Sequence, residues 1–199
     1  MRPITGILLA AGAGRRFGVL SGTHKLLQTL PGGEPLAVAA GRNLIAAVPD
    51  SIAVVRAGDL QLAAALAAVG LRIVEHPGAE GGLGTSLAAG VAAAPDAAGW
   101  LIALGDMPWV QPDTISDLAQ ALAGGAPLVA PTTAGHRGHP VGFAALWRDH
   151  LLNLRGDQGA RDLIAAQAGQ LLLLPTEDPG VLLDVDTPAD LPSLHRSAV

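Results

Sequence analysis

The sequence lacks the residues that form covalent cross-links and soft metal sites. None of its 199 residues is a cysteine, which excludes disulfides, thiolate catalysis and cysteine-ligated zinc or iron–sulfur centres. Lysine is nearly absent too, because Lys25 is the only one. Charged residues make up 15% of the chain, so a site for a highly charged ligand has to be built from a few placed cations.

The chain also lacks long apolar runs and a basic balance of charge. No stretch has the length and continuity of a membrane span, and a formal net charge of −5 argues against nucleic-acid and anionic-membrane partners. Arg2 followed by an apolar run resembles a secretion signal, but Thr5 and Gly6 interrupt that run. We interpret the run as the first buried strand of a cytoplasmic protein.

Apolar residues, half of the total, are arranged as alternating strands and helices. They suffice for the core of one α/β domain. Their spacing predicts a first strand from residue 4, further strands at 51–56, 71–75, 100–104, 127–130, 170–174 and 181–186, helices at 35–48, 60–69, 113–123 and 161–167, and an alanine-rich helix ending at 94. This rhythm indicates right-handed βαβ units and a mainly parallel sheet, in which ligands bind beyond the carboxyl ends of the strands.

A glycine-rich, basic loop follows the first predicted strand. Residues 12–18 contain three glycines and the adjacent pair Arg15 and Arg16, and Lys25 comes shortly afterwards. Glycine lets backbone N–H groups approach an anion closely, while guanidinium and ammonium groups supply positive charge. We therefore expect this loop to bind a triphosphate. The glycines nearly match the G-x-G-x-x-G dinucleotide fingerprint, but the last one comes one position late.

Carboxylates follow two later apolar runs. Asp106 comes directly after residues 100–104, a position suited to holding Mg²⁺, although capping a turn is an ordinary alternative. Asp184 and Asp186 alternate with apolar residues, so both are expected on one face of an extended strand. Thr187 precedes a proline, as a helix cap often does, which leaves Asp186 as a second candidate metal ligand.

Three further segments combine glycine with polar residues. Residues 81–87 lead into a helix and either present N–H groups to an anion or simply cap that helix with a hydroxyl. Residues 132–143 hold two histidines and an arginine, which either donate hydrogen bonds to a ligand or form a polar hairpin. A catalytic zinc is disfavoured there, because no third ligand accompanies the histidines. Asp157, within 156–161, is a natural N-cap.

Together these segments resemble the nucleotidyltransferases that complete the molybdenum cofactor. The resemblance extends over nearly the whole chain and implies a single three-layer Rossmann-like nucleotidyltransferase domain, residues 1–199, with a mainly parallel mixed sheet. The motifs that carry it, in order, are Leu9-Ala10-Ala11-Gly12, Phe17-Gly18, Lys25-Leu26-Leu27, Gly82-Leu83-Gly84-Thr85-Ser86-Leu87, Leu104-Gly105-Asp106-Met107-Pro108, Arg137-Gly138-His139-Pro140-Val141, Gly156-Asp157-Gln158-Gly159-Ala160-Arg161 and Asp184-Val185-Asp186-Thr187-Pro188.

The resemblance implies a role for most polar residues of these motifs. Arg16, Lys25 and Asp106 would be catalytic, and Asp106 and Asp186 would bind Mg²⁺. The nucleotide-binding residues would be Leu9, Ala10, Ala11, Gly12, Ala13, Gly14, Arg15, Gly82, Gly84, Thr85 and Ser86. The residues that bind the second substrate would be His136, Arg137, Gly138, His139, Asp157 and Arg161. In one departure from the family, residues 19–24 lengthen the spacer before Lys25, so the two arginines are the alternative carriers of charge if Lys25 does not reach the phosphates.

Two positions take the form of the cytidylyl branch of that family. Ala11 and His139 stand where guanylyl enzymes tend to carry glycine and glutamine. The resemblance therefore implies CTP and molybdopterin as substrates, with pyrophosphate and molybdopterin cytosine dinucleotide as products. A recipient molybdoenzyme or its maturation chaperone is an expected further partner.

Other functions stay open on the sequence alone. A related nucleotidyltransferase that uses GTP, or a sugar-phosphate or alditol-phosphate acceptor, would need the same first loop and Asp106. A dinucleotide-binding oxidoreductase is disfavoured, because Arg56 stands where an acidic residue is expected after the second strand. A nucleotide-binding carrier that performs no catalysis is the third alternative.

Overall fold

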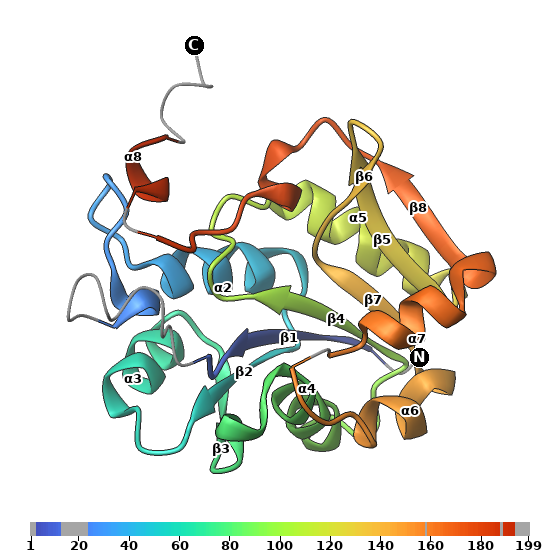
Figure 1. The fold of residues 1–199 in the computed structure, drawn as a ribbon, viewed down its shortest axis with the longest axis horizontal. Helices are drawn as coiled ribbons and strands as arrows, with labels where there is room; N and C mark the ends of the chain where they lie inside the picture. Colours follow the sequence, from blue (N-terminus) through green and yellow to red (C-terminus); the bar gives the residue numbers. More distant parts are fainter. Residues whose placement is uncertain (1–2, 13–23, 158, 188, 194–199) are drawn as a thin grey trace.

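Eight strands form one mixed sheet in the computed structural model, which describes residues 3–12, 24–157, 159–187 and 189–193. The sheet order is β3-β2-β1-β4-β7-β5-β6, and β8 also pairs with β5 (Figure 1). Strands β1 to β4 are mutually parallel, and β7 runs antiparallel between β4 and β5. The strands are β1 (Ile4–Ala10), β2 (Ser51–Arg56), β3 (Arg72–His76), β4 (Gly99–Leu104), β5 (Leu128–Thr133), β6 (His136–Arg137), β7 (Val141–Ala144) and β8 (Leu171–Pro175).

Helices cover both faces of the sheet, which gives the three-layer α/β arrangement (Figure 1). Side chains of α2, α3 and α5 pack on one face, and those of α4, α6 and α7 pack on the other. The helices are α2 (Leu36–Ala47), α3 (Leu60–Ala68), α4 (Leu83–Ala93), α5 (Pro112–Ala123), α6 (Arg148–Leu152), α7 (Arg161–Ala166) and α8 (Asp190–Ser193). Among the described residues, no helix combines the length and apolarity needed to cross a bilayer.

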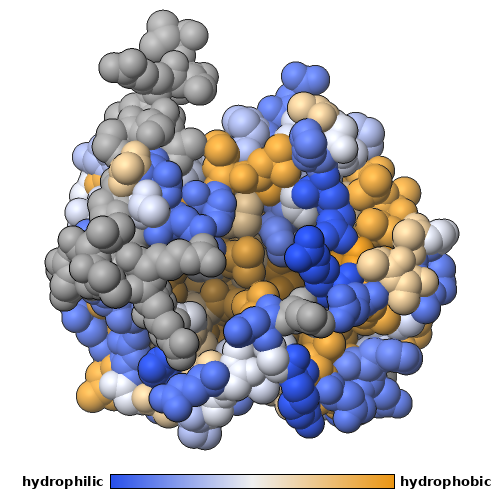
Figure 2. Space-filling model, in the orientation of Figure 1, coloured by the Kyte–Doolittle hydropathy of each residue, from blue (hydrophilic) through white to orange (hydrophobic). Residues whose placement is uncertain are grey.

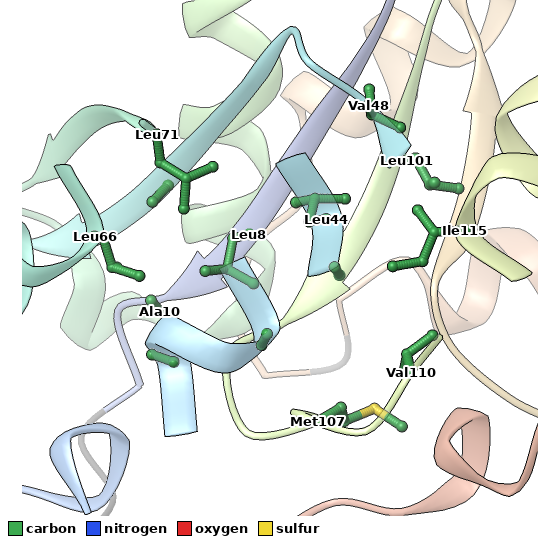
Figure 3. Packing of buried hydrophobic residues seen from close by; sticks show 14 of the residues in the cluster. Leu8, Ala10, Leu44, Val48, Leu66, Leu71, Leu101, Met107, Val110 and Ile115 are labelled. Atoms are coloured by element: carbon green, nitrogen blue, oxygen red, sulfur yellow. The ribbon is translucent and has the colours of Figure 1, made fainter. Parts of the chain in front are cut away.

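The central strands are apolar on both faces, which explains their uninterrupted hydrophobic sequences. Successive side chains of a strand point to opposite faces. In β1, Leu8 and Ala10 therefore pack toward α2 and α3, whereas Ile7 and Leu9 pack toward α4. Figure 3 shows the first of these clusters, in which side chains from the sheet and its covering helices meet around Leu8.

Local sequence signals explain where several elements begin and end. The Asp59 carboxylate accepts a hydrogen bond from the backbone N–H of Leu62 (3.3 Å) and caps α3. Gly70 has a φ of +98°, a left-handed conformation that ends the segment after α3. Pro112 occupies the first position of α5, where a missing N–H costs no hydrogen bond. The helices and strands predicted between residues 35 and 130 are confirmed to within a few residues.

The structure corrects the sequence-based prediction in two regions. Residues 181–186 do not form a strand; a 3-10 helix, Pro179–Leu182, comes first and is followed by an irregular segment. Asp178 starts that helix by accepting a hydrogen bond from the N–H of Gly180 (2.8 Å). Strand β7 was not predicted, because it has only four residues and a glycine inside it. That glycine, Gly142, is needed for packing, since a Cβ there would lie 2.6 Å from Leu122 and Val129.

We predict that Leu101→Ala lowers the free energy of unfolding by about 2–5 kcal/mol. Leu101 lies in the central strand β4 and is fully buried, so the truncated side chain leaves a cavity in the core. Urea denaturation measures the change. Leu146→Ala is the matched control, because Leu146 is 61% exposed and its truncation is expected to change stability by less than ~0.5 kcal/mol. Equal effects of the two substitutions would contradict the assignment of the core.

Candidate active site

The carboxyl ends of three neighbouring parallel strands carry polar or small residues. Ala11 and Gly12 follow β1, Arg56 ends β2, and Asp106 comes two residues after β4. Because β1 lies between β2 and β4, these residues meet at one edge of the sheet. This is the edge at which α/β sheets bind ligands.

Three carboxylates converge at this edge. Asp106, Asp184 and Asp186 each place one oxygen so that the three oxygens lie within 4.8 Å of one another. The backbone holds them together, because the N–H of Val185 donates to the carbonyl oxygen of Asp106 (3.0 Å). The Asp190 carboxylate accepts hydrogen bonds from the backbone N–H of Asp186 (3.0 Å) and fixes the turn after it. The predicted proximity of residues 184 and 186 is thus produced by an irregular segment.

The chain's single lysine lies among these carboxylates. Lys25 Nζ donates to Asp106 Oδ2 (2.8 Å) and to Asp186 Oδ1 (3.2 Å). Its side chain is only 10% exposed. Burial opposes the charge, but the two carboxylates outweigh burial and raise the pKa of the ammonium above 10.5. Lys25 therefore reaches the acidic cluster in spite of the long spacer before it.

The acidic cluster fits a divalent cation. Burial raises the pKa of Asp184, and the neighbouring charges of Asp186 and Asp106 raise it further. Such repulsion between carboxylates is relieved when a cation binds between them. Oxygen ligands of this kind suit Mg²⁺ and Mn²⁺. The structure thus adds Asp184 as a third candidate to the two metal ligands expected from the sequence.

A cavity of about 460 Å³ opens beside Lys25 and Asp106. Its floor is apolar and its rim carries charges and backbone groups, which suits a nucleotide. Figure 2 shows a hollow of this kind in the middle of the viewed face, with hydrophobic residues at its base and hydrophilic residues around it. The lining consists of Leu9, Ala11, Gly12, Lys25, Leu26, Arg56, Ala79, Glu80, Gly82, Leu83, Ser86, Leu104, Asp106 and Asp157.

The loop at residues 82–86 is built against the loop at 156–157. Gly82 has a φ of +93°, and a Cβ there would lie 2.4 Å from the Asp157 carboxylate. The N–H of Gly84 donates to the carbonyl oxygen of Gly156 (2.8 Å). Two segments that are about seventy positions apart in the sequence therefore form one wall. Gly84 packs against the second loop and does not line the cavity.

The hydroxyl residues of this loop do not cap the helix. The N-cap of α4 is Gly82, with no side-chain hydrogen bond to the helix start. Thr85 Oγ1 donates within the loop to the carbonyl oxygen of Gly82 (2.9 Å) and lies 3.2 Å from His76 Nε2. Thr85 does not line the cavity, whereas Ser86 does. Asp157 is not the N-cap of α7 either, because Ala160 takes that position.

A second cavity of about 280 Å³ adjoins the first. The two share Leu9, Leu83 and Leu104 in their walls. The second is mostly apolar, with two arginines and a histidine at its border. Its remaining lining residues are Leu87, Ile102, Arg137, His139, Val141, Phe143, Ala160, Arg161 and Ile164.

Of the residues around His139, only some line the second cavity. Burial lowers the pKa of His139, and the charge of Arg137 lowers it further. The buried Nδ1 atom has no hydrogen-bond partner among the described residues. Gly138 lies against the backbone of Val181, where a Cβ would meet its carbonyl oxygen at 2.3 Å. His136 is exposed in β6 and lines neither cavity.

The structure brings together most, but not all, of the residues singled out in the sequence. Asp157, expected beside the second substrate, lines the larger cavity. Ala10 lines neither of the two adjoining cavities. Ala13, Gly14, Arg15 and Arg16 lie outside the described residues. Arg56 and Glu80 were not selected from the sequence as site residues, although the position of Arg56 at the carboxyl end of a parallel strand was a usable signal.

Comparison with known proteins places these residues in a wider context. Residues 6–171 match the family described as the MobA-like NTP transferase domain. A named relative, nicotine blue oxidoreductase of Paenarthrobacter nicotinovorans, is 31% identical over 193 residues, which cover 92% of each chain. A solved nucleotidyl transferase from Methanothermobacter is 25% identical, with coverage of 96% of this chain and 95% of that one and a TM-score of 0.81.

A second solved structure is a complex with a metal ion. The Rv0371C protein of Mycobacterium tuberculosis in complex with manganese is 26% identical, with coverage of 98% and 99% and a TM-score of 0.80. The family match includes Lys25, Asp106 and both cavity loops but ends before Asp184. The acidic segment is therefore contributed by residues beyond the matched range.

We predict that Lys25→Met tightens the binding of Mn²⁺ in the absence of nucleotide by roughly tenfold, the equivalent of one charge-assisted hydrogen bond. The ammonium neutralises the carboxylates that a cation would use, and methionine keeps the length of the side chain without its charge. Calorimetric titration with MnCl₂ measures the affinity. Arg42→Met is the control, because Arg42 pairs with Glu34 and lines neither cavity. Unchanged or weaker binding by the Lys25 variant would contradict the prediction.

Proposed function

Because the chain belongs to the MobA-like NTP transferase family, we propose that it transfers a cytidylyl group from CTP to the terminal phosphate of molybdopterin. Pyrophosphate is released, and the product is molybdopterin cytosine dinucleotide. The observation that carries this proposal is the pair of adjoining cavities, one beside the acidic cluster and one bordered by arginines. A transferase with two large substrates needs two such sites that meet where the reaction takes place.

The larger cavity is assigned to CTP. Its triphosphate lies toward Lys25, whose ammonium supplies positive charge to the phosphate oxygens. Backbone groups of Ala11 and Gly12 line the same wall. The leaving pyrophosphate gains charge during the reaction, so cations placed beside it lower the barrier.

The second cavity is assigned to molybdopterin. Arg137 and Arg161 border it and suit an anionic acceptor, since a guanidinium binds phosphate through paired hydrogen bonds. Phe143 and Ile164 offer an apolar wall for a flat ring system. The acceptor phosphate then enters beside Leu104, the residue that the two cavities share next to the acidic cluster.

The reaction is an in-line displacement at the α-phosphorus. An oxygen of the acceptor phosphate forms a bond to that phosphorus, and the bond from phosphorus to the α–β bridging oxygen breaks. Asp106, Asp184 and Asp186 would hold Mg²⁺, which neutralises phosphate charge and makes the α-phosphorus more electrophilic when bound. No proton has to be removed from an ionised phosphate, so the residues act by positioning and by charge.

The choice of CTP rests on Ala11 and His139. Both positions take the form found in the cytidylyl branch of the nucleotidyltransferases that complete the molybdenum cofactor. Ala11 lines the nucleotide cavity, while His139 borders the acceptor cavity. A molybdoenzyme or its maturation chaperone is the proposed recipient of the product. GTP as donor, or a sugar phosphate as acceptor, is the alternative within the same reaction class.

An oxidoreductase is the second candidate function. The name of the Paenarthrobacter relative favours it, because that protein is called nicotine blue oxidoreductase and is similar over 92% of this chain. Against it, Arg56 ends β2 and lines the nucleotide cavity. Sites for NAD usually carry an acidic residue there for the ribose hydroxyl groups.

We predict that Asp106→Asn lowers the rate of pyrophosphate release by about 100-fold or more with CTP, molybdopterin and Mg²⁺ present. The amide keeps the shape of the side chain but removes the charge that the metal needs. Asp96→Asn is the matched control, since Asp96 is exposed and lines neither cavity. Activity of the Asp106 variant within a few-fold of the wild type would remove the proposed metal role.

For the unmodified protein we predict a clear preference for CTP over GTP, ATP and UTP with molybdopterin as acceptor. Pyrophosphate and the dinucleotide product are measured together, so that hydrolysis of the nucleotide is not counted as transfer. A preference for GTP would contradict the interpretation of Ala11 and His139. Titration with NADH in the same series addresses the second candidate, and a change in nicotinamide fluorescence would favour the oxidoreductase.

A further inference from the structure

Two oppositely charged side chains line the nucleotide cavity away from its acidic cluster. Arg56 is the last residue of β2, and Glu80 lies in the 3-10 helix Ala79–Gly81 that follows β3. Both are part of the cavity wall. Arg56 also borders a smaller hollow with His24 and Asp59, but those two residues pair with each other (2.8 Å).

Neither side chain has a partner within the described ranges. Arg56 forms no side-chain hydrogen bond or ion pair there, and Glu80 forms none either. They also do not pair with each other, although they line the same cavity. Arg56 is half-buried, and a guanidinium that is partly removed from water without a partner loses hydrogen bonds that a ligand can restore.

The order of the strands separates these two residues from the reaction centre. The sequence β3-β2-β1-β4 runs along one edge of the sheet. Asp106 follows β4, Gly12 follows β1, Arg56 ends β2, and Glu80 comes after β3. Neighbouring strands are ~4.8 Å apart, so three steps along the edge amount to ~14 Å. A nucleotide whose triphosphate lies at β4, beside Lys25 and the acidic cluster, and whose ribose crosses β1 directs its base toward β2 and β3.

The direction of the side chain agrees with this placement. In β2, Ile52 and Val54 pack on the α4 face of the sheet, and Ala53 and Val55 pack on the opposite face. By alternation, Arg56 projects to the α4 face. Gly82, Leu83 and Ser86, at the start of α4, line the cavity on that same face.

We propose that Arg56 and Glu80 read the nucleobase of the donor, with Arg56 donating to ring acceptors and Glu80 accepting from an exocyclic amino group. Cytosine presents two adjacent acceptors, N3 and O2, beside an amino group on C4. Carboxylates are known acceptors for that amino group, and arginine pairs with adjacent acceptors on a base. Uracil has no amino group for Glu80, and adenine has no adjacent pair of acceptors for Arg56. Guanine satisfies both, so the pair separates cytosine and guanine from uracil and adenine.

This inference rests on the proposed function, in which the larger cavity binds the nucleotide donor. It does not involve Ala11 or His139, on which the choice of CTP rests. It assigns the exclusion of uracil and adenine to two charged side chains. The remaining choice between the two permitted bases stays with the cavity walls.

Calorimetric titrations with CTP and with inorganic tripolyphosphate, both with Mg²⁺, test the role of Arg56. Arg56→Ala is expected to weaken CTP binding by about tenfold or more, while tripolyphosphate binding changes by less than about twofold. Arg56→Lys is expected to remain weak for CTP, because lysine keeps the charge but not the paired donors. Arg72→Ala is the matched control, since Arg72 is exposed at the opposite end of β3.

The outcome for Glu80 is read from the ratio of CTP to UTP affinity. Glu80→Gln is expected to lower that ratio, because an amide can also donate to the uracil carbonyl oxygen.

An equal loss of CTP and tripolyphosphate binding by Arg56→Ala would make Arg56 a phosphate ligand and overturn the proposal. An unchanged CTP affinity would overturn it as well. If the wild type prefers another base, the proposed CTP reaction fails, but comparison of that nucleotide with tripolyphosphate still decides the role of Arg56.

Discussion

A single ammonium group stabilises three carboxylates that would otherwise repel one another. Lys25 donates to Asp106 and Asp186, and Asp184 lies within the same cluster. Because the protein has no other lysine, this arrangement places a compact charge at the edge of β4. Under the proposed function it would define where the phosphates lie, and from that point the order of the strands would determine the positions of the base and the acceptor.

One wall of the larger cavity depends on backbone contacts. A Cβ at Gly82 would lie 2.4–2.6 Å from Asp157 and Gly156, and a Cβ at Gly84 would lie 3.0 Å from the carbonyl oxygens of Arg155 and Gly156. This wall is therefore held by close packing of two loops, while charged side chains occupy the rim. This separation of tasks is physically reasonable, because backbone packing positions a site precisely and side chains supply its chemistry.

Much of the fold was predictable because apolar periodicity and turn residues act locally. The carboxyl edge of the sheet also followed from the pattern, and the position of Asp106 after a parallel strand made it a candidate metal ligand, with turn capping as the alternative. The contact of Lys25 with Asp106 did not follow, because it joins residues 81 positions apart. Asp184 was placed correctly beside Asp186 but through a predicted strand that is absent. In the sequence, Arg56 served only as evidence against a dinucleotide-binding oxidoreductase, and its place in the wall of the larger cavity required the structure.

The glycine contacts between residues 82–84 and 156–157 also bear on how such a site can change during evolution. A side chain at Gly82 would displace the second loop, because a Cβ there would lie 2.4–2.6 Å from Asp157 and Gly156. A mutation at this position would therefore disturb the larger cavity. Arg137 and Arg161 border only the second cavity and are exposed. Under the proposed function, changes of acceptor are therefore most accessible to selection through those two positions, with the nucleotide site inherited intact.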